Sequence, residues 1–160
     1  MGNETVKFTV NGKGVSLEVE PGDMLVDVLR ERLGLTGTKA GCREGECGVC
    51  SVIMNGTLVA SCILPIKKAE GATILTIEGL EANRELHLVQ KRFIDNGAIQ
   101  CGFCTPAMVL AGKALLDKNP RPTRKEIQLA ISGILCRCTG YQKIIKAIDS
   151  ASKSGKRGEA

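Results

Sequence analysis

The chain has 160 residues, enough for one ordinary domain or for two small ones that would each bury a limited core. Aromatic side chains are scarce, with no Trp, one Tyr and three Phe, so bound metal would help to stabilise domains of this size. The net charge is +5, from 22 Lys and Arg against 17 Asp and Glu. Nucleic-acid binders usually concentrate basic residues on one face and interleave them with aromatic residues, and this sequence shows neither feature. We therefore expect no nucleic-acid partner.

The sequence carries no signal for a membrane or for export. No apolar run approaches the ~20 residues of a membrane span. The first ten residues lack the charged start, apolar stretch and cleavage site of a signal peptide. We therefore expect a cytoplasmic protein without a membrane span. In a reducing compartment, eight cysteines favour metal ligation over disulfides.

The first half of the chain begins with the pattern of a β-hairpin. Apolar and polar residues alternate over 6–10 and again over 15–19, on either side of a turn that starts with Asn11-Gly12. A helix follows, with Asp23 as a suitable N-cap and Gly34 at its end.

Further strands are predicted after a glycine-rich stretch, 37–48, that carries three cysteines. Asn55-Gly56 marks a second hairpin, and 72–78 has the pattern of a closing strand. A hairpin, a crossing helix and more strands within so short a segment predict an α+β fold. We assign residues 1–79 to a β-grasp domain of the plant-type ferredoxin-like kind.

The second half changes to helical periodicity, and we predict a C-terminal four-helix bundle domain over residues 84–152, followed by a flexible basic tail at 153–160. Leu86, Val89 and Phe93 mark the first helix. The starts of the other helices are marked by capping signals: Thr105 followed by Pro106, Thr123 with Glu126, and Thr139 with Gln142.

Four cysteines in the first half have the spacing of plant-type [2Fe–2S] ferredoxins. The pattern is C-x4-C-x2-C and then a fourth cysteine after eleven residues: Cys42, Cys47, Cys50 and Cys62. Three thiolates must converge from one loop, and glycines within that loop let the backbone wrap tightly around the sulfurs. This quartet predicts one [2Fe–2S] cluster.

Four more cysteines in the second half form two close pairs that 31 residues separate. They are Cys101 and Cys104, then Cys136 and Cys138. This spacing is less specific, because paired cysteines also bind zinc. Cys104 and Cys138 each precede a predicted helix start, so two helix N-termini are expected to converge on the site and to favour an anionic cluster.

Other interpretations of the cysteines remain open at this stage. Eight cysteines could form disulfides, although the chain has no secretory signal. Zinc could fill both quartets, an alternative that rests mainly on the second, and the chain would then be a zinc-stabilised interaction module. His87, the only histidine, is expected to be a surface or capping residue rather than a ligand.

Three sequence blocks resemble the small iron–sulfur subunit of the molybdenum hydroxylase, or xanthine dehydrogenase, family. They are 41–50 (GCREGECGVC), 100–106 (QCGFCTP) and 136–141 (CRCTGY). The resemblance covers nearly the whole chain except the basic tail. It implies two [2Fe–2S] clusters, one in a ferredoxin-like domain and one in a four-helix domain.

The resemblance also implies partners and a direction of electron flow. Electrons would leave a molybdenum–pterin cofactor on a large subunit, pass the helical-domain cluster and then the ferredoxin-like cluster, and reach FAD on a medium subunit. By the same resemblance, Gln100 and Cys138 lie close to the pterin. The chain would therefore serve as the electron-transfer subunit of a hetero-oligomer and would not be catalytic alone.

The sequence of this chain does not identify the substrate of such a complex. Purine or xanthine, nicotinate and similar N-heterocycles lead the expectations, while aldehydes, carbon monoxide and aromatic acyl-CoA remain open. A free-standing two-cluster ferredoxin that shuttles between enzymes is the alternative redox function.

Overall fold

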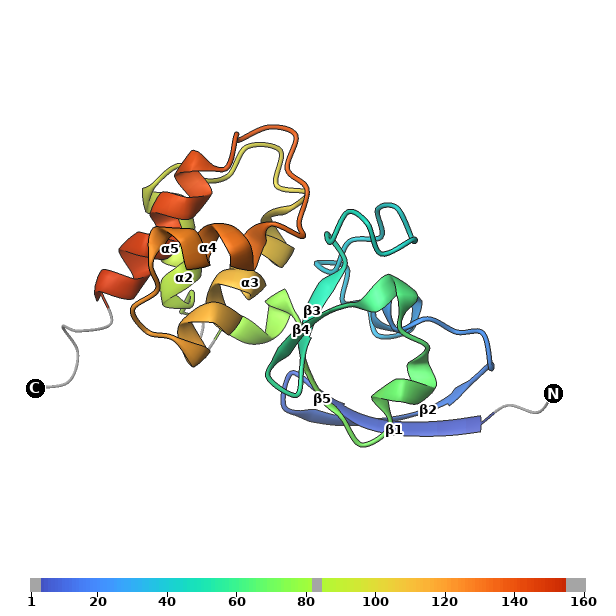
Figure 1. Ribbon diagram of the computed structural model, residues 1–160. Helices are drawn as coiled ribbons and strands as arrows, with labels where there is room; N and C mark the ends of the chain where they lie inside the picture. The colour runs from blue at the N-terminus through green and yellow to red at the C-terminus, as the bar shows by residue number, and fades with distance from the viewer. Residues whose placement is uncertain (1–3, 82–84, 155–160) are drawn as a thin grey trace, which may run out of the picture.

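The computed structural model describes residues 4–81 and 85–154. A five-stranded mixed sheet with one short helix occupies the first half of the chain, and four helices occupy the second half (Figure 1). This arrangement agrees with the α+β prediction and with a ferredoxin-like first half. Within the described residues, no helix is long and apolar enough to cross a membrane.

The sheet has the strand order β2-β1-β5-β3-β4. The strands are β1 Glu4–Val10, β2 Lys13–Val19, β3 Ser51–Met54, β4 Thr57–Ala60 and β5 Thr73–Leu75. β1 pairs antiparallel with β2 and parallel with β5, and β3 pairs antiparallel with β4 and β5. Both predicted hairpins are confirmed, and positive φ angles at Asn11 (51°) and Asn55 (49°) explain why Asn-Gly suits the two turns.

The helix that crosses the sheet is shorter and less regular than predicted. α1, Leu25–Asp27, continues as a π-helical turn, Val28–Arg32. The prediction that Asp23 caps this helix is wrong. Its carboxylate instead accepts a hydrogen bond from the backbone N–H of Glu20 at 3.0 Å, and Met24 occupies the N-cap position.

The closing strand is also shorter than the predicted 72–78. β5 ends at Leu75, and Ile77–Leu80 forms a 3₁₀ turn. The buried Thr76 separates the two, because its backbone N–H donates to the side chain of Asn11 at 2.9 Å. Two more 3₁₀ turns, Ser61–Ile63 and Ile66–Ala69, follow β4.

Four helices form the second half: α2 Leu88–Asp95, α3 Thr105–Lys118, α4 Arg124–Ile131 and α5 Gln142–Ser154. The capping box of Thr123 and Glu126 is confirmed. His87 caps α2, as its Nδ1 accepts from the backbone N–H of Val89 at 3.2 Å. The predicted cap at Thr105 is one residue late, because Cys104 is the N-cap and Thr105 is the first helical residue.

The two halves share one of the hydrophobic cores. Phe93 and Met108 are buried in the helical half, and the same cluster includes Val49 and Ile53 from the strand half. β3 and β4 accordingly pack against α3. A second cluster lies beneath the sheet around Phe8 and contains only residues of the first half.

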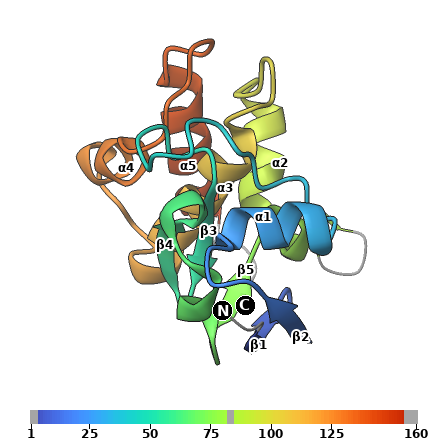
Figure 2. The ribbon, with the colours of Figure 1, turned by 90° about the vertical axis from the view of Figure 1, so that its right-hand side faces the viewer.

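The loop between α1 and β3, drawn in cyan, reaches from the strand half to the helical half (Figure 2). This loop carries Cys42, Cys47 and Cys50. It approaches the α4–α5 connection, which carries Cys136 and Cys138, because the backbone N–H of Leu135 donates to the carbonyl oxygen of Cys47.

Candidate metal centres

The first centre lies in the loop that precedes β3. Cys42 and Cys47 are half-buried within the loop, Cys50 is buried at its end, and Cys62 is buried in the 3₁₀ turn after β4. Cys42 and Cys47 each accept a hydrogen bond at sulfur from the backbone N–H of the other, and burial, followed by the neighbouring Cys50 thiol, raises the pKa of Cys62 to about 11. The structure therefore places the four cysteines of the predicted quartet as two neighbouring pairs, Cys42 with Cys47 and Cys50 with Cys62.

Backbone amides surround the sulfurs of this loop. The Sγ of Cys42 accepts hydrogen bonds from the N–H groups of Glu44 and Cys47, both at 3.4 Å, and Cys47 Sγ accepts one from the Cys42 N–H at 3.4 Å. The amides of Glu44 and Cys47 lower the pKa of Cys42 to about 6. Because the thiolate is the form that binds metal, this loop is prepared to supply a ligand near neutral pH.

Two glycines of the loop are required by its geometry. Gly45 has a φ of +81°, a conformation that residues with a Cβ rarely adopt. A Cβ on Gly41 would lie 2.8 Å from the Sγ of Cys47, closer than side-chain contacts allow. The glycines that marked this stretch in the sequence thus leave room for the sulfurs.

The second centre is assembled from two separate loops. Cys101 and Cys104 come from the α2–α3 connection, and Cys136 and Cys138 come from the α4–α5 connection. The sulfurs of Cys138 and Cys101 lie 3.5 Å apart, and both residues are exposed. The sulfur of Cys104 interacts with that of Cys136, and burial, followed by this neighbour, raises the pKa of Cys104 to about 12.

The predicted capping box at Thr139 is not formed, and helix α5 begins only at Gln142. Gly140 and Tyr141 both have left-handed backbone conformations, with φ of +61° and +64°, which a helix cannot include. The hydroxyl of Thr139 lies instead 3.0 Å from the Sγ of Cys136. One helix N-terminus, that of α3 at Cys104, therefore borders the centre directly, rather than the two expected.

The sulfurs are grouped in pairs, which tests the kind of metal that would fit. No disulfide joins any of the eight cysteines. Within 4–81 and 85–154, no three His, Cys, Asp or Glu side chains are grouped to hold a single ion, whereas a structural zinc ion needs four donors around one point. Two sulfurs on each of two irons is the ligation of a [2Fe–2S] cluster, and the paired arrangement fits it.

A direct backbone contact joins the two centres, and sequence analysis did not foresee it. The N–H of Leu135, next to Cys136, donates to the carbonyl oxygen of Cys47 at 2.9 Å. Gly48 makes this approach possible, because a Cβ there would overlap the carbonyl oxygen of Gly133. The glycine was visible in the sequence, but its partner in the α4–α5 loop was not.

The outer edge of the second centre is open to solvent. Gln100 and the adjacent Cys101 are exposed, as is Cys138 beside them. Two apolar side chains on the same loops are also exposed, Phe103 at 49% and Leu135 at 54%. The exposed sulfur pair is thus flanked by both polar and apolar side chains.

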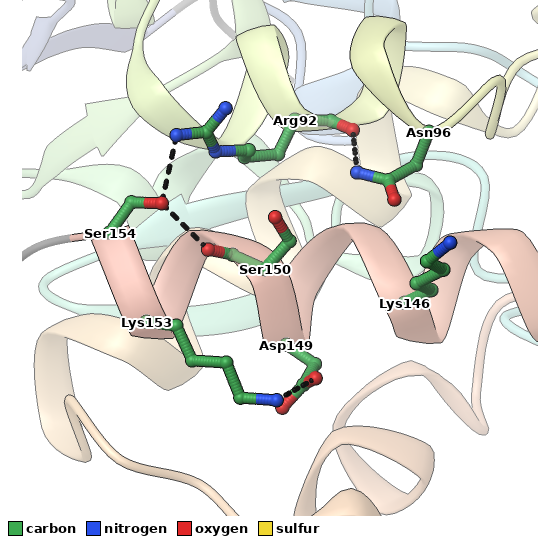
Figure 3. Close-up of a pocket in the computed structure, with 7 residues that line it drawn as sticks. All are labelled: Arg92, Asn96, Lys146, Asp149, Ser150, Lys153 and Ser154. Atoms are coloured by element: carbon green, nitrogen blue, oxygen red, sulfur yellow. Dashed lines mark hydrogen bonds and ion pairs between the residues drawn. The ribbon is translucent and has the colours of Figure 1, made fainter.

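A polar cavity of about 560 Å³ lies elsewhere, between α2 and α5 (Figure 3). Arg92 reaches across it to the hydroxyl of Ser154 at 2.8 Å, and Lys153 pairs with Asp149 at 2.6 Å. None of the eight cysteines lines this cavity. It is therefore separate from both sulfur quartets.

Comparison with known families matches each half of the chain to an iron–sulfur domain. Residues 8–76 match the "2Fe-2S iron-sulfur cluster binding domain", and residues 76–149 match the "[2Fe-2S] binding domain". The protein is therefore an iron–sulfur protein with two [2Fe–2S] domains.

Individual relatives narrow this class. The chain is 50% identical to the nicotinate dehydrogenase small FeS subunit of Eubacterium barkeri, over 92% of this chain and 94% of that one. It is 43% identical to the aldehyde oxidoreductase of Megalodesulfovibrio gigas, over 95% of this chain but 17% of the longer relative. Among solved structures, quinoline 2-oxidoreductase from Pseudomonas putida 86 superposes with a TM-score of 0.93 at 42% identity, covering all of both chains.

These findings place the chain in the family of small iron–sulfur subunits of molybdenum hydroxylases, the xanthine dehydrogenase family. Its function is electron transfer within an oxidoreductase complex, and it is not catalytic alone. Other, larger subunits are implied by the small-subunit relatives.

Proposed function

We propose that the chain conducts electrons from a molybdenum–pterin centre on a large subunit, through its two [2Fe–2S] clusters, to FAD on a medium subunit. The cluster of the helical half, held by Cys101, Cys104, Cys136 and Cys138, is the one nearer to molybdenum. The cluster of the strand half, held by Cys42, Cys47, Cys50 and Cys62, is the one nearer to flavin. When bound on the partners, the pterin and flavin groups supply hydroxylation chemistry and electron acceptance.

The observation that carries this proposal is the hydrogen bond from the Leu135 N–H to the Cys47 carbonyl. It connects a residue of one quartet to the neighbour of a cysteine in the other through a single short contact. An electron that enters at the second cluster thus has a continuous protein path to the first. The contact gives the two proposed clusters a short route for electron transfer through the protein.

The molybdenum side of the chain is proposed to be the exposed edge at Gln100 and Cys138. Cys138 lies 3.5 Å from the sulfur of Cys101, so a group that touches this edge is close to the cluster itself. Gln100 offers both an amide donor and an acceptor beside it, and these are the groups that a pterin ring would pair with.

We propose an N-heterocycle such as nicotinate, purine or xanthine as the substrate of the complex. Two similar proteins support this proposal. The Eubacterium barkeri subunit belongs to a nicotinate dehydrogenase, and the Pseudomonas structure is a quinoline 2-oxidoreductase. The pterin-bearing subunit, not this chain, would select the substrate.

We further propose the organisation in which 1–79 and 84–152 are two domains, the second a four-helix bundle, in a cytoplasmic protein. The support for the bundle is the packing of α2 on α3 and α5 and of α4 on α3 and α5. The shared core around Met108 implies that the two domains stabilise each other. Of the proposed tail, 153–160, Lys153 and Ser154 still belong to α5, and the remainder lies outside the described residues.

Metal analysis of the purified chain tests the redox function. We expect about four iron atoms and four acid-labile sulfides per chain, with two distinguishable spin signals after reduction by dithionite. Zinc without iron would overturn the proposal in favour of an interaction module.

Co-purification tests the partners. A tagged chain should carry with it a large molybdenum-containing subunit and a flavin-containing subunit in fixed proportion. A lone chain that retains both clusters through purification would instead support the free-standing ferredoxin.

A further inference from the structure

A side-chain hydroxyl, that of Thr139, contacts the sulfur of Cys136. The Oγ1 of Thr139 lies 3.0 Å from Cys136 Sγ, and the backbone N–H of Thr139 donates to the same sulfur at 3.5 Å. In the first centre, by contrast, the donors to sulfur are backbone amides of the loop, at 3.4 Å. The two centres thus differ in the chemistry that surrounds their ligands.

The direction of the Thr139 hydrogen bond follows from its neighbours. The backbone N–H of Tyr141 donates to Thr139 Oγ1 at 3.2 Å, so the oxygen accepts there and keeps its own proton free. A cysteine that binds iron is a thiolate and has no proton to give. The hydroxyl of Thr139 must therefore be the donor and the sulfur of Cys136 the acceptor.

The loop holds this hydroxyl in place from both sides. The phenol oxygen of Tyr141 accepts from the N–H of Cys136 at 2.8 Å and donates to the carbonyl of Ile134 at 3.2 Å. Ile134 is itself buried in the core of the helical half, which anchors the start of the loop. Cys136 and Thr139 are both half-buried, so water competes less for the hydrogen bond than it would at an open surface.

We propose that Thr139 raises the reduction potential of the second cluster by donating a hydrogen bond to the sulfur of Cys136. The inference rests on the proposed function, in which Cys136 is a ligand of that cluster. Reduction adds one electron and hence one negative charge, part of which resides on the ligand sulfurs. A donor to sulfur stabilises this reduced state more than the oxidised one, and hydrogen bonds to sulfur are an established determinant of cluster potential.

The consequence is a role in receiving electrons. A higher potential at the second cluster favours transfer from the molybdenum side into the chain. Thr139 would accordingly set the driving force of the first step without touching substrate, pterin or flavin.

The test is a redox titration of the full chain with both clusters in place, comparing Thr139→Val with Thr139→Ser. Valine keeps the branched shape and removes the hydroxyl, whereas serine keeps the hydroxyl. We expect valine to lower the equilibrium constant for reduction of the second cluster by about tenfold, or ~59 mV for a one-electron couple. Serine should restore most of the shift, and the first cluster should be unchanged in both variants.

Ser61→Ala provides a matched control in the first centre. The hydroxyl of Ser61 donates to the backbone carbonyl of Cys50 at 2.7 Å rather than to a sulfur. Its loss should leave the potential of the first cluster close to that of the unaltered chain, even where it reduces stability. A shift as large as that of Thr139→Val would mean that any lost hydroxyl has this effect, and the proposal would be wrong.

An unchanged potential in a Thr139→Val chain that retains the second spin signal would overturn the inference while leaving the proposed function intact. If valine prevents cluster assembly, Thr139→Ala and Thr139→Ser are compared by resonance Raman spectroscopy in H₂O and D₂O. Serine should show a larger deuterium shift of the iron–sulfur stretches than alanine, and equal shifts would contradict the proposal. Persistence of an unaltered second spin signal in Cys136→Ala, which offers iron no donor, would instead contradict the ligand assignment itself.

Discussion

The first centre takes three of its four cysteines from nine consecutive residues, 42–50, whereas the second takes two pairs from loops that 31 residues separate. The first is therefore closed largely by local turns, in which Gly45 and its neighbours fold the backbone around the sulfurs. The second exists only when α3, α4 and α5 have packed and brought their connecting loops together.

The surroundings of the two centres differ in the same way. Amides of its own loop point at the sulfurs of the first centre, while the second adds the hydroxyl of Thr139 and leaves Cys101 and Cys138 exposed. The difference teaches that similar cysteine sets can be held by local geometry or by helix packing. The two centres should therefore respond to different substitutions.

The largest effect is expected from removing one ligand of either centre. Cys47→Ser should damage the first cluster and largely spare the second, and Cys136→Ser should do the reverse, since each cluster depends on its own four thiolates. Each variant should lose about half of the iron and one of the two spin signals after reduction. Loss of both signals in a folded chain would show that the centres are not independent.

The next largest effect is expected where the two centres meet, at Gly48. An added Cβ would overlap the Gly133 carbonyl, and the φ of +66° is unfavourable for alanine. Gly48→Ala should cost about 2–5 kcal/mol of unfolding free energy, combining backbone strain with overpacking.

Gly71→Ala is a control that measures the cost of backbone strain without the overlap that a Cβ at Gly48 would make with the Gly133 carbonyl. Gly71 has a nearly identical φ of +68° but open space around it, so only the backbone cost of about 1–2 kcal/mol should appear in denaturant unfolding. Equal losses in the two variants would argue against a tight contact between the centres.

A smaller effect is expected from the hydrogen bond between the centres. Leu135→Pro removes the N–H that donates to the Cys47 carbonyl and should cost at least about 1 kcal/mol. Rapid-freeze measurements of the two spin signals should show slower electron exchange between clusters. Leu135→Ala keeps the N–H, and because the side chain is mostly exposed, it should behave like the unaltered chain.

The smallest effect expected is a pH dependence of the stability of the helical half, caused by His87. Burial, followed by the charge of Lys113, lowers the pKa of His87 below its ordinary value of 6.5. The folded chain thus binds this proton less tightly than the unfolded chain, so stability is lost as pH falls below 6.5.

His87→Asn should reduce this sensitivity, because asparagine keeps an acceptor for the Val89 N–H and does not titrate. The measurement is the melting temperature above and below pH 6.5 in both chains. An identical fall in the two would exclude His87 as the cause.

Local patterns in the sequence predicted both hairpins and the helical character of the second half. Asn11-Gly12 and the Thr123 capping box succeed because their geometry depends on residues a few positions away. The predictions at Asp23 and Thr139 failed for a related reason. Each side chain can make several local hydrogen bonds, and the surrounding fold selects one other than the helix cap.

The sequence by itself determined the family and the spacing of the first cysteine quartet, because three short blocks and the turn glycines of one loop are local properties of the chain. Only the tertiary structure decided that the Leu135 N–H meets the Cys47 carbonyl and that the Thr139 hydroxyl faces a sulfur. Those contacts depend on how helices that are far apart in the sequence pack around a shared core. No local sequence pattern determines how closely their connecting loops approach one another.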